Sequence, residues 1–591
     1  MPSGPLIRLG NALRDWPELE IWYHPEYRLP LSSVEAVTGL ELRRADYVAW
    51  YLLERRLSGP EQIQRPERIG FGDLALVHTD EYLESLQDPE VLARAFGVDP
   101  SDVPVEPLLG TIRLACGATC AATRRVLGAR GKRTLHAFNL LGGFHHAARS
   151  RGGGNCAVND IAVAIAALRR DGFDGHVWVM DLDAHPPDGL AECLRHDGRA
   201  HISSLSGSDW GSLPGVDETR LPPGCTDAEY LAQLRALLLR HPGPPPGLAF
   251  VIAGGDVVAA DRLGTLGLTE AGVRRRDLLV ARALRRVPTV WLPGGGYQRD
   301  AWRVTTGTAL VLLGRPRWRI SPHTDPLSLR YASIARSLDD RQLAEHDESI
   351  TQDDLLDMFS RAADRPPRLL GFYTAQGAEH ALQRYGFLAQ VERLGYSRLR
   401  VAVDFAGSGD RLRVFGQDPD LREHVLVEAV MAKQTVGPAE VLFLNWLTLR
   451  HPRASFSALR PPLPGQDVPG LGMAREASEL LAIMARRLGL HGIAFRPSWY
   501  HMAYAARHTT HFIDPAREGR FQALVRDLAA LPLLEATQAV DRGEVWMDGA
   551  PYTWEADDMV HWASPDHAPP DQDAVRRERD RVSFTVHPAA R

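Results

Sequence analysis

Short apolar runs alternate with amphipathic stretches between about residues 110 and 315, and this alternation constrains the fold more than any other feature. Three of the runs are HVWVMDLD, GLAFVIAGGD and VPTVWLPGGG, and each ends in Asp or Gly. Helical segments separate them, including LACGATCAATRRVLG, NDIAVAIAALRRDG, YLAQLRALLLRH and RRRDLLVARALRR. Apolar strands alternating with amphipathic helices indicate an α/β fold, with an open parallel sheet flanked by helices.

The chain is longer than one ordinary domain. With 591 residues, 44% of them hydrophobic and 24% charged, it can bury at least two cores. We expect a first domain at 1–315, a helical connector at 316–367, an α/β or α+β C-terminal domain at 368–562 and a flexible tail at 563–591. In the connector, SITQDDLLDMFSRA predicts a helix that RPP ends. In the C-terminal domain, LRVAVDFAGSGDRLRVFG predicts a hairpin with its turn at Ser408-Gly409-Asp410.

Composition argues against several classes of partner. The formal charge is −6 and no basic run stands out, which argues against a nucleic-acid partner. No stretch approaches the roughly 18 apolar residues of a membrane helix, and the first residues lack a secretory pattern. The five cysteines are odd in number and lack CxxC spacing, so we expect free thiols in a reducing cytoplasm. Cys116 and Cys120, four apart on a predicted helix, are expected in the core.

The carboxyl ends of the predicted strands carry side chains suited to bind a metal ion. Ligands of open parallel sheets bind at these ends. Asp183 and His185 follow the first strand at positions i and i+2, so both side chains point to the same side of the chain. Asp256, at the end of the second strand, supplies a third ligand. One histidine, two carboxylates and an open position are typical of catalytic zinc, and the same donors accept ferrous iron.

Groups suited to proton transfer occur beside these donors. A glycine-flanked loop carries His145 and His146, and the third strand leads through three glycines to Tyr297. Adjacent histidines serve as general base and acid where carboxylates hold their tautomers, and a tyrosine can stabilise an oxyanion. Each feature alone is common in loops, turns and packed cores. Their joint occurrence predicts metal-assisted hydrolysis of an amide or similar acyl bond.

Five motifs resemble those of a known family. GGFHHA, GGGNCAVND, DLDAHPPDG, GGDVVAADRLG and PGGGY occur in the order found in zinc-dependent histone deacetylases. That family has the arginase–deacetylase fold and includes acetylpolyamine amidohydrolases and acetoin-utilisation proteins. YHPEYRLP, LVHTDEYLESL and LPPGCTDAEYLAQL are most similar to the bacterial class IV members. The resemblance covers about residues 20–315 and implies a zinc-dependent amidohydrolase acting on acetyl- or acyl-lysine, an acylated polyamine or another small amide.

The resemblance also implies a role for each matched residue. Its zinc ligands correspond to Asp183, His185 and Asp256. Its catalytic groups correspond to His145, His146 and Tyr297, with Asp181 and Asp188 as carboxylate partners of the histidines. Its substrate contacts correspond to Phe144, Gly154, Asn155 and Trp210. A monovalent-cation site, K⁺ in many relatives, would use Asp181, Asp183, Ser204 and Leu205.

Two features depart from the family pattern. Pro186-Pro187 replace the His-Gly or Gln-Gly that usually follows the metal-binding histidine. They supply no ligand, but they remove N–H donors and stiffen the loop. Asn155 stands where relatives commonly place a Phe that walls the acyl-lysine tunnel. We therefore expect an active hydrolase with an altered substrate; the alternative is a catalytically silent binding module coupled to an acyltransferase-like C-terminal domain.

The C-terminal half carries no motif of comparable strength. LFLNWLTL, PGQDVPGLG, MAREASELLAIMARRLGL and HGIAFRP predict a strand, a turn, a helix and a strand. This order is similar to that of GNAT acetyltransferases around their pyrophosphate loop, and such a domain would bind acetyl-CoA. Gln466 lies one residue too far from Gly470-Leu471-Gly472 for the usual spacing, so an ordinary turn is the competing interpretation. The sequence does not indicate how many copies of the chain associate.

Overall fold

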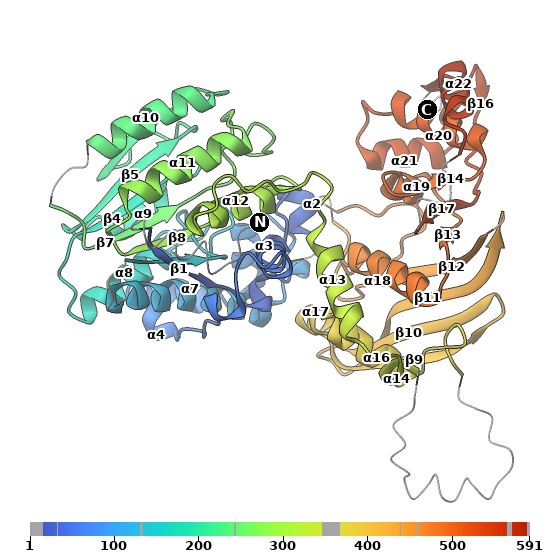
Figure 1. The fold of residues 1–591 in the computed structure, drawn as a ribbon, viewed down its shortest axis with the longest axis horizontal. Coiled ribbons are helices and arrows are strands. Elements are labelled where there is room, and N and C mark those ends of the chain that lie inside the picture. Colours follow the sequence, from blue (N-terminus) through green and yellow to red (C-terminus); the bar gives the residue numbers. More distant parts are fainter. Residues whose placement is uncertain are drawn as a thin grey trace, which may run out of the picture. The chain divides into compact units, whose positions relative to one another are not determined.

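The computed structural model describes residues 16–31, 33–129, 134–240, 244–344, 367–437, 439–457, 460–563 and 570–587. The chain divides into two compact units, residues 1–330 and 331–591 (Figure 1). The first unit ends later than the boundary predicted at residue 315. The reason is that the chain beyond 315 still bonds to the first unit: the Trp318 indole N–H donates to the Tyr51 hydroxyl at 3.0 Å.

The first unit contains an eight-stranded sheet in the order β2-β1-β3-β8-β7-β4-β5-β6, in which every neighbouring pair is parallel. The strands are β1 (Glu18–Trp22), β2 (Ile63–Gln64), β3 (Leu135–Asn139), β4 (Val177–Asp181), β5 (Ala200–Ser206), β6 (Val216–Arg220), β7 (Leu248–Ile252) and β8 (Thr289–Leu292). All residues of β3, β4, β7 and β8 are buried, because helices cover both faces of the sheet. The predicted α/β architecture is confirmed.

Five long helices cover this sheet: α7 (Val105–Gly128), α8 (Asp160–Arg170), α10 (Asp227–Leu239), α11 (Glu270–Ala283) and α12 (Ala301–Leu312). Figure 1 shows α7 and α8 on one side and α10, α11 and α12 on the other. Local sequence sets where they begin. Thr226 and Glu229 form a reciprocal capping box at the start of α10, and Asn159 caps α8 through the N–H of Ala162.

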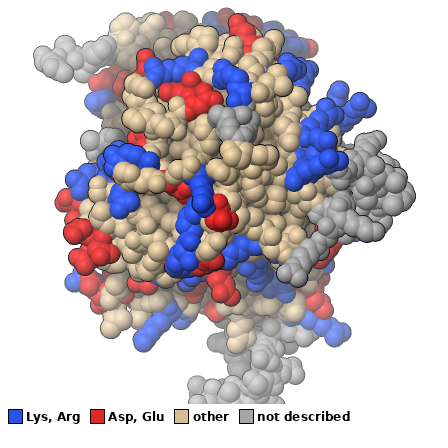
Figure 2. Space-filling model, turned by 90° about the vertical axis from the view of Figure 1, so that its left-hand side faces the viewer, with Lys and Arg blue, Asp and Glu red and all other residues tan. Residues whose placement is uncertain are grey.

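The five cysteines all lie in the first unit and are free thiols. Cys116 and Cys120 are buried on α7, as predicted from their spacing. None of the described helices has both the length and the apolar character needed to cross a membrane. On the face that lies at the left of Figure 1, acidic and basic side chains are interspersed (Figure 2).

The second unit contains a seven-stranded mixed sheet in the order β14-β17-β13-β12-β11-β10-β9. Its strands are β9 (Ser397–Ala406), β10 (Gly409–Gln417), β11 (Glu423–Val436), β12 (Ala439–Leu449), β13 (Gly492–Phe495), β14 (His511–Phe512) and β17 (Met559–Trp562). β9 and β10 form the predicted hairpin, but Ala406 pairs with Gly409, so the turn lies at Gly407 and Ser408, slightly earlier than predicted. A second sheet-containing domain is therefore present.

The helices of the second unit bear on two further predictions. They include α16 (Ala375–Arg384), α17 (Phe387–Arg393), α18 (Ala474–Arg487), α19 (Tyr500–Ala506), α20 (Pro515–Asp527) and α21 (Leu533–Asp541). The strand, helix and strand predicted from residues 442–497 correspond to β12, α18 and β13, and β13 runs parallel to β12. In the connector, the structure has α13 (Pro326–Ser337) and α14 (Asp340–Ala344), whereas the helix predicted at 349–362 lies outside the described residues.

The prediction of a flexible tail at 563–591 is wrong for residues 570–587. This segment forms α22 (Gln572–Arg581) and β18 (Phe584–Val586). β18 pairs with β15 (Val545–Met547), which also pairs with β16 (Ala550–Pro551). Val575, Val582 and Phe584 are buried. Three apolar side chains are enough to dock an otherwise polar segment, and a composition-based interpretation misses them.

Candidate metal centre

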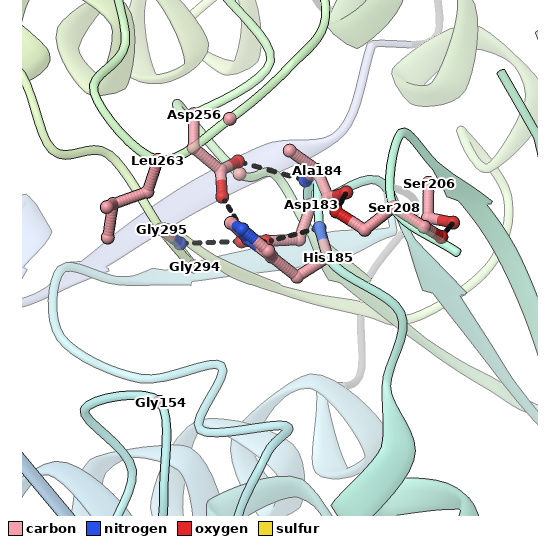
Figure 3. Close-up of polar contacts among 12 residues, drawn as sticks. Gly154, Asp183, Ala184, His185, Ser206, Ser208, Asp256, Leu263, Gly294 and Gly295 are labelled. Atoms are coloured by element: carbon pink, nitrogen blue, oxygen red, sulfur yellow. Dashed lines mark hydrogen bonds and ion pairs between the residues drawn. The ribbon is translucent and has the colours of Figure 1, made fainter. Parts of the chain in front are cut away.

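Two carboxylate side chains and one imidazole converge beyond the carboxyl ends of β4 and β7. Asp183, His185 and Asp256 each offer one ligand atom, and these atoms lie within 4.8 Å of one another. Nδ1 of His185 lies 3.2 Å from Oδ1 of Asp183 and 3.0 Å from Oδ2 of Asp256 (Figure 3). The structure thus brings together the three residues for which the sequence predicts a metal site.

The electrostatics of this cluster favour a bound cation. Both carboxylates are buried, which is unfavourable for paired negative charges. Burial and the charge of Asp183 raise the pKa of Asp256 to about 7. Burial opposes protonation of His185, but hydrogen bonds to Asp183 and Asp256 outweigh it and raise the pKa of His185 to about 11. The cluster therefore binds protons tightly, which shows that it favours positive charge. One imidazole and two carboxylates are also a set of ligands that zinc or ferrous iron binds.

Glycines of the PGGGY motif let the backbone approach the two carboxylates. The Gly295 N–H donates to Oδ2 of Asp183 at 2.7 Å (Figure 3). A Cβ atom on Gly295 would lie 2.4 Å from Oδ2 of Asp256, and one on Gly294 would lie 2.8 Å from Oδ2 of Asp183. Gly294 also has φ +57°, which favours glycine. Both positions therefore require glycine for steric reasons.

The two adjacent histidines are each oriented by a carboxylate. Their ring centroids are 4.1 Å apart. Nδ1 of His145 lies 2.7 Å from Oδ2 of Asp181, and Nδ1 of His146 lies 2.7 Å from Oδ1 of Asp188. This leaves Nε2 of each ring to face other groups.

The pair is electrostatically asymmetric. Burial and the neighbouring His145 lower the pKa of His146 to about 4, so His146 is neutral at pH 7. Burial also opposes the charge on His145, but Asp181 and Asp183 outweigh it and raise its pKa to about 9. A cation at Asp183 would lower the pKa of His145, because it counters the carboxylate charge.

Tyr297 lies beside this cluster. Only 7% of it is exposed, and burial together with the charges of Asp183 and Asp256 raises its pKa well above the usual value. The phenol therefore keeps its proton at neutral pH. Its backbone N–H donates to Oδ2 of Asp261 at 2.7 Å.

The residues for which the sequence predicts substrate contacts lie around the histidines. The Trp210 ring lies 5.0 Å from the His146 ring and 5.9 Å from the His185 ring, and 48% of Trp210 is exposed. A Cβ atom on Gly154 would lie 2.3 Å from Cδ2 of His146, so this backbone packs directly on the imidazole. Asn155 follows with φ +62°. Phe144 is half-buried, and its N–H donates to Asp160.

The residues of the predicted monovalent-cation site lie on neighbouring strands. Asp181 on β4 is paired in register with Ser204 on β5, and both residues are fully buried. The Ser204 hydroxyl has no hydrogen-bond partner among the described residues, and Leu205 beside it is also buried. A buried hydroxyl without a partner is unfavourable unless another group binds it. The site therefore fits a cation that accepts hydroxyl, carbonyl and carboxylate oxygens.

Pro186 and Pro187 occupy positions that need few backbone donors. Pro187 directly precedes α9 (Asp188–Leu194), where the first N–H groups of a helix have no partner within the helix. The Pro187 carbonyl accepts from the N–H of Ala191, and the Pro186 carbonyl accepts from the N–H of Asp188. The prolines thus start the helix that carries Asp188 towards His146.

Four buried or partly buried polar residues support the site, and none of them was predicted to do so from the sequence. Two of them are arginines. The Arg44 guanidinium donates to the carbonyl oxygens of Gly294 and Gly295 at 2.8 and 3.0 Å. The Arg276 guanidinium, which is fully buried, donates to the carbonyls of Leu182 and Gly254. These carbonyls precede Asp183 and Asp256, the two candidate aspartate ligands, so Arg276 connects the two loops that carry them.

The other two are aspartates, Asp160 and Asp261, and they lie within motifs already noted. Asp160, in GGGNCAVND, accepts the N–H groups of Gly143 and Phe144 and so fixes the loop that carries the histidines. Asp261, in GGDVVAADRLG, holds the backbone of Tyr297. Their place in the motifs was the available signal, whereas Arg44 and Arg276 offered none.

Comparison with known proteins places this arrangement in a family. Residues 40–312 match the family model described as the histone deacetylase domain. Histone deacetylase 2 of Arabidopsis thaliana is 30% identical over 303 residues, which cover 49% of this chain and 76% of that protein. An uncharacterized protein of Picosynechococcus is 29% identical over 292 residues, covering 47% of this chain and 92% of that protein.

Among solved structures, an HDAC homolog from Aquifex aeolicus is similar with a TM-score of 0.44 at 22% identity, covering 57% of this chain and 93% of that one. The family assignment rests on the sequence matches, and the matched range 40–312 contains the five motifs together with Asp183, His185 and Asp256. The chain belongs to the histone deacetylase family.

Proposed function

We propose that the first unit is a divalent-metal-dependent deacylase that hydrolyses an N-acyl amide to a carboxylate and an amine. The observation that carries this proposal is the convergence of Asp183, His185 and Asp256 within 4.8 Å, beside two carboxylate-oriented histidines. Zinc is the expected metal, and ferrous iron suits the same donors. The substrates proposed are an acylated lysine, an acylated polyamine or another small amide.

The chemistry supplied by a bound cation is polarisation of the acyl carbonyl and a lower pKa for a water molecule. His146 is neutral and accepts a proton from the attacking water at Nε2, because its Nδ1 is engaged with Asp188. His145 and the Tyr297 hydroxyl stabilise the negative charge that develops on the acyl oxygen. The C–N bond then breaks, and the amine nitrogen takes up a proton from the histidine pair.

A monovalent cation at Asp181 and Ser204 forms part of the proposal. The buried Ser204 hydroxyl, without a partner among the described residues, supports it. Such a cation would offset the buried charge of Asp181, which orients His145. Hydrolysis would then depend on K⁺ or Na⁺ at constant ionic strength.

Metal analysis joined to a substrate panel tests the proposed function. The purified full-length chain should carry about one divalent ion and hydrolyse at least one acyl-lysine or acylpolyamine. Asp183→Ala should lose the metal, and Tyr297→Phe should keep it but lower kcat by about 10²- to 10³-fold. Asp174→Ala is a matched control, because this carboxylate is 89% exposed. A metal-free chain whose hydrolysis survives Asp183→Ala contradicts the mechanism.

Absence of hydrolysis in a metal-loaded chain would favour the alternative function, a silent acyl-binding module. In the second unit, β12 and β13 pair in parallel only from Leu442 to Leu444, while β12 continues to Leu449, and α18 follows the glycine-containing turn. This arrangement supports an acetyl-CoA site there. Calorimetric titration of the full-length chain with acetyl-CoA tests it, and a flat titration contradicts it.

A further inference from the structure

Asn155 has an unusual backbone conformation that fixes the direction of its side chain. Its φ angle is +62°, in the left-handed region that asparagine tolerates better than most residues. Its N–H donates to the carbonyl of Ala95 at 2.9 Å, and a bridge between Gly153 and Cys156 closes the turn around it. Gly154, on the same turn, packs on the His146 imidazole. The Asn155 side chain is therefore held next to the proposed catalytic groups.

The Asn155 carboxamide lies beside Tyr297 and carries an unpaired acceptor. The Asn155 side chain opposes the rise in the Tyr297 phenol pKa that burial causes. Its Oδ1 atom is buried and has no hydrogen-bond partner among the described residues. A buried acceptor without a donor is unfavourable, so a donor on a bound molecule would complete this group.

We propose that Asn155 determines substrate specificity: its Oδ1 accepts a hydrogen bond from a hydroxyl or amino group close to the scissile nitrogen of the substrate. This inference rests on the proposed function, because it takes the Tyr297 side of the site as the place where the acyl amide binds. The preferred substrate class is then an N-acylated amino alcohol, amino sugar or short diamine. A plain N-acylated alkylamine is the disfavoured class.

Trp210 supplies the apolar complement to this acceptor. Its indole lies against the rings of His146 and His185 and is 48% exposed. The turn that carries Asn155 and the Trp210 indole both contact the His146 ring, so a substrate bound at this ring would pack its carbon skeleton on the indole. A chain of methylenes would pack equally well on Trp210 but would leave Oδ1 unpaired, which corresponds to about a tenfold loss in kcat/KM.

Matched substrate pairs test the proposal in the full-length, zinc-loaded chain. Each pair has the same size and differs only in a donor, for example N-acetylethanolamine against N-acetylpropylamine. We expect a preference for the hydroxylated member of about tenfold. Asn155→Leu should abolish or reverse this preference, and Asn155→Asp should keep it and shift it towards amino-substituted substrates, because it adds a negative charge. Asn445→Leu, the same change on β12 of the second unit, should leave the preference unchanged.

A binding measurement separates this inference from the proposed function. Calorimetry with alkyl and hydroxyalkyl hydroxamates reports recognition without turnover. The hydroxyalkyl compound should bind about tenfold more tightly, and this difference should vanish in Asn155→Leu and in Asn155→Gly. Asn155→Gly keeps the left-handed backbone accessible, so a loss of preference there cannot be attributed to misfolding.

The outcomes of the two measurements are distinct. Hydroxamate selectivity that depends on Asn155, without hydrolysis of any amide, supports Asn155 as a hydrogen-bond acceptor for a bound ligand and overturns the proposed function. Hydrolysis with the same preference in wild type and Asn155→Leu, both with wild-type thermal unfolding, overturns the inference alone. A zinc-loaded chain that neither hydrolyses the amides nor binds the hydroxamates overturns both.

Discussion

The carboxylate of Asp261 accepts a 2.7 Å hydrogen bond from the backbone N–H of Tyr297. Its other oxygen accepts the N–H groups of Leu263 and Gly264, which belong to its own loop. Asp261 therefore connects the loop after β7, which carries the proposed metal donor Asp256, to the loop after β8, which carries Tyr297. The proposed oxyanion donor is positioned by the same loop that carries a proposed ligand.

Removal of the hydrogen bond between Asp261 and Tyr297 should lower kcat more than it changes substrate or metal binding. We expect Asp261→Ala to lower kcat by about tenfold to a hundredfold with little change in KM or metal content, because Tyr297 loses its alignment. Asp261→Asn should have a smaller effect, since its carboxamide oxygen still accepts from the Tyr297 N–H. Steady-state kinetics and metal analysis of both variants check this. An equal loss of metal and kcat in Asp261→Ala would show that the residue serves the metal instead.

Metal binding at neutral pH should release protons. The metal-free cluster holds protons on His185, whose pKa is about 11, and partly on Asp256, whose pKa is about 7. A metal ion must displace them, so affinity should fall as pH falls below about 11, and more steeply below about 7 where Asp256 is also protonated. Calorimetry in buffers of different ionisation enthalpy should show release of at least one proton per zinc. Zinc binding that is independent of pH and buffer would contradict this assignment of protons.

The first unit should lose stability in mild acid through two buried neutral histidines that lie outside the candidate metal centre. Burial lowers the pKa of His136 and of His78 to about 4 each. The unfolded chain takes up these protons near pH 6.5 but the folded chain does not, so stability falls as pH drops from about 6.5 towards 4. Each group contributes on the order of 3 kcal/mol across this window.

The variant His136→Gln tests this prediction. It should lower stability at pH 7, because the hydrogen bonds to Leu284 and Trp291 are disturbed, yet it should flatten the decline between pH 6.5 and 4. Urea unfolding at several pH values measures both effects. His323→Gln is the control, since His323 is exposed and its replacement should leave the slope unchanged. An unaltered slope in His136→Gln would exclude His136 as the source.

The C-terminal strand should stabilise the second unit. Phe584 is 5% exposed and packs in the core that contains Phe512 and Phe521. Phe584→Ala should therefore destabilise this unit by about 3 to 5 kcal/mol. Thr585→Ala, at the exposed next position of the same strand, should change stability by less than about 1 kcal/mol. Thermal unfolding of both variants provides the measurement, and an effect of Phe584→Ala as small as that of Thr585→Ala would argue against a structural role for β18.

The general architecture and the clustering of Asp183, His185 and Asp256 were predictable because the signals for both lie in short stretches of sequence. Each donor follows an apolar run that can only be a buried strand, and the carboxyl ends of parallel strands meet at one edge. The supporting groups are different. Arg44 lies 250 positions before Gly294, and an arginine on a helix resembles a surface residue until the fold is known. Long-range hydrogen bonds of this kind leave no periodic trace in the sequence.

Long-range contacts also explain why residues 570–587 were not predicted to be ordered. Residues 570–587 are polar on average, and β18 acquires its partner β15 from a region almost 40 positions earlier. Neither Val575 nor Phe584 is part of a periodic run. Composition describes the average of a segment, whereas docking depends on a few side chains and on the cavity they meet. Asn155 shows a related limit, because its backbone conformation and its unpaired oxygen are properties of the folded turn.

The distribution of the thiols makes their alkylation a probe of local opening in the first unit. All five cysteines belong to the first unit, and burial raises the pKa of each of them, to about 12 for Cys120 and Cys193. At neutral pH almost no thiolate is present, so an alkylating reagent reacts slowly, and the four buried thiols react appreciably only when their surroundings open. The rate of alkylation therefore reports openings of the deacetylase-like unit alone, while the second unit stays silent to the reagent.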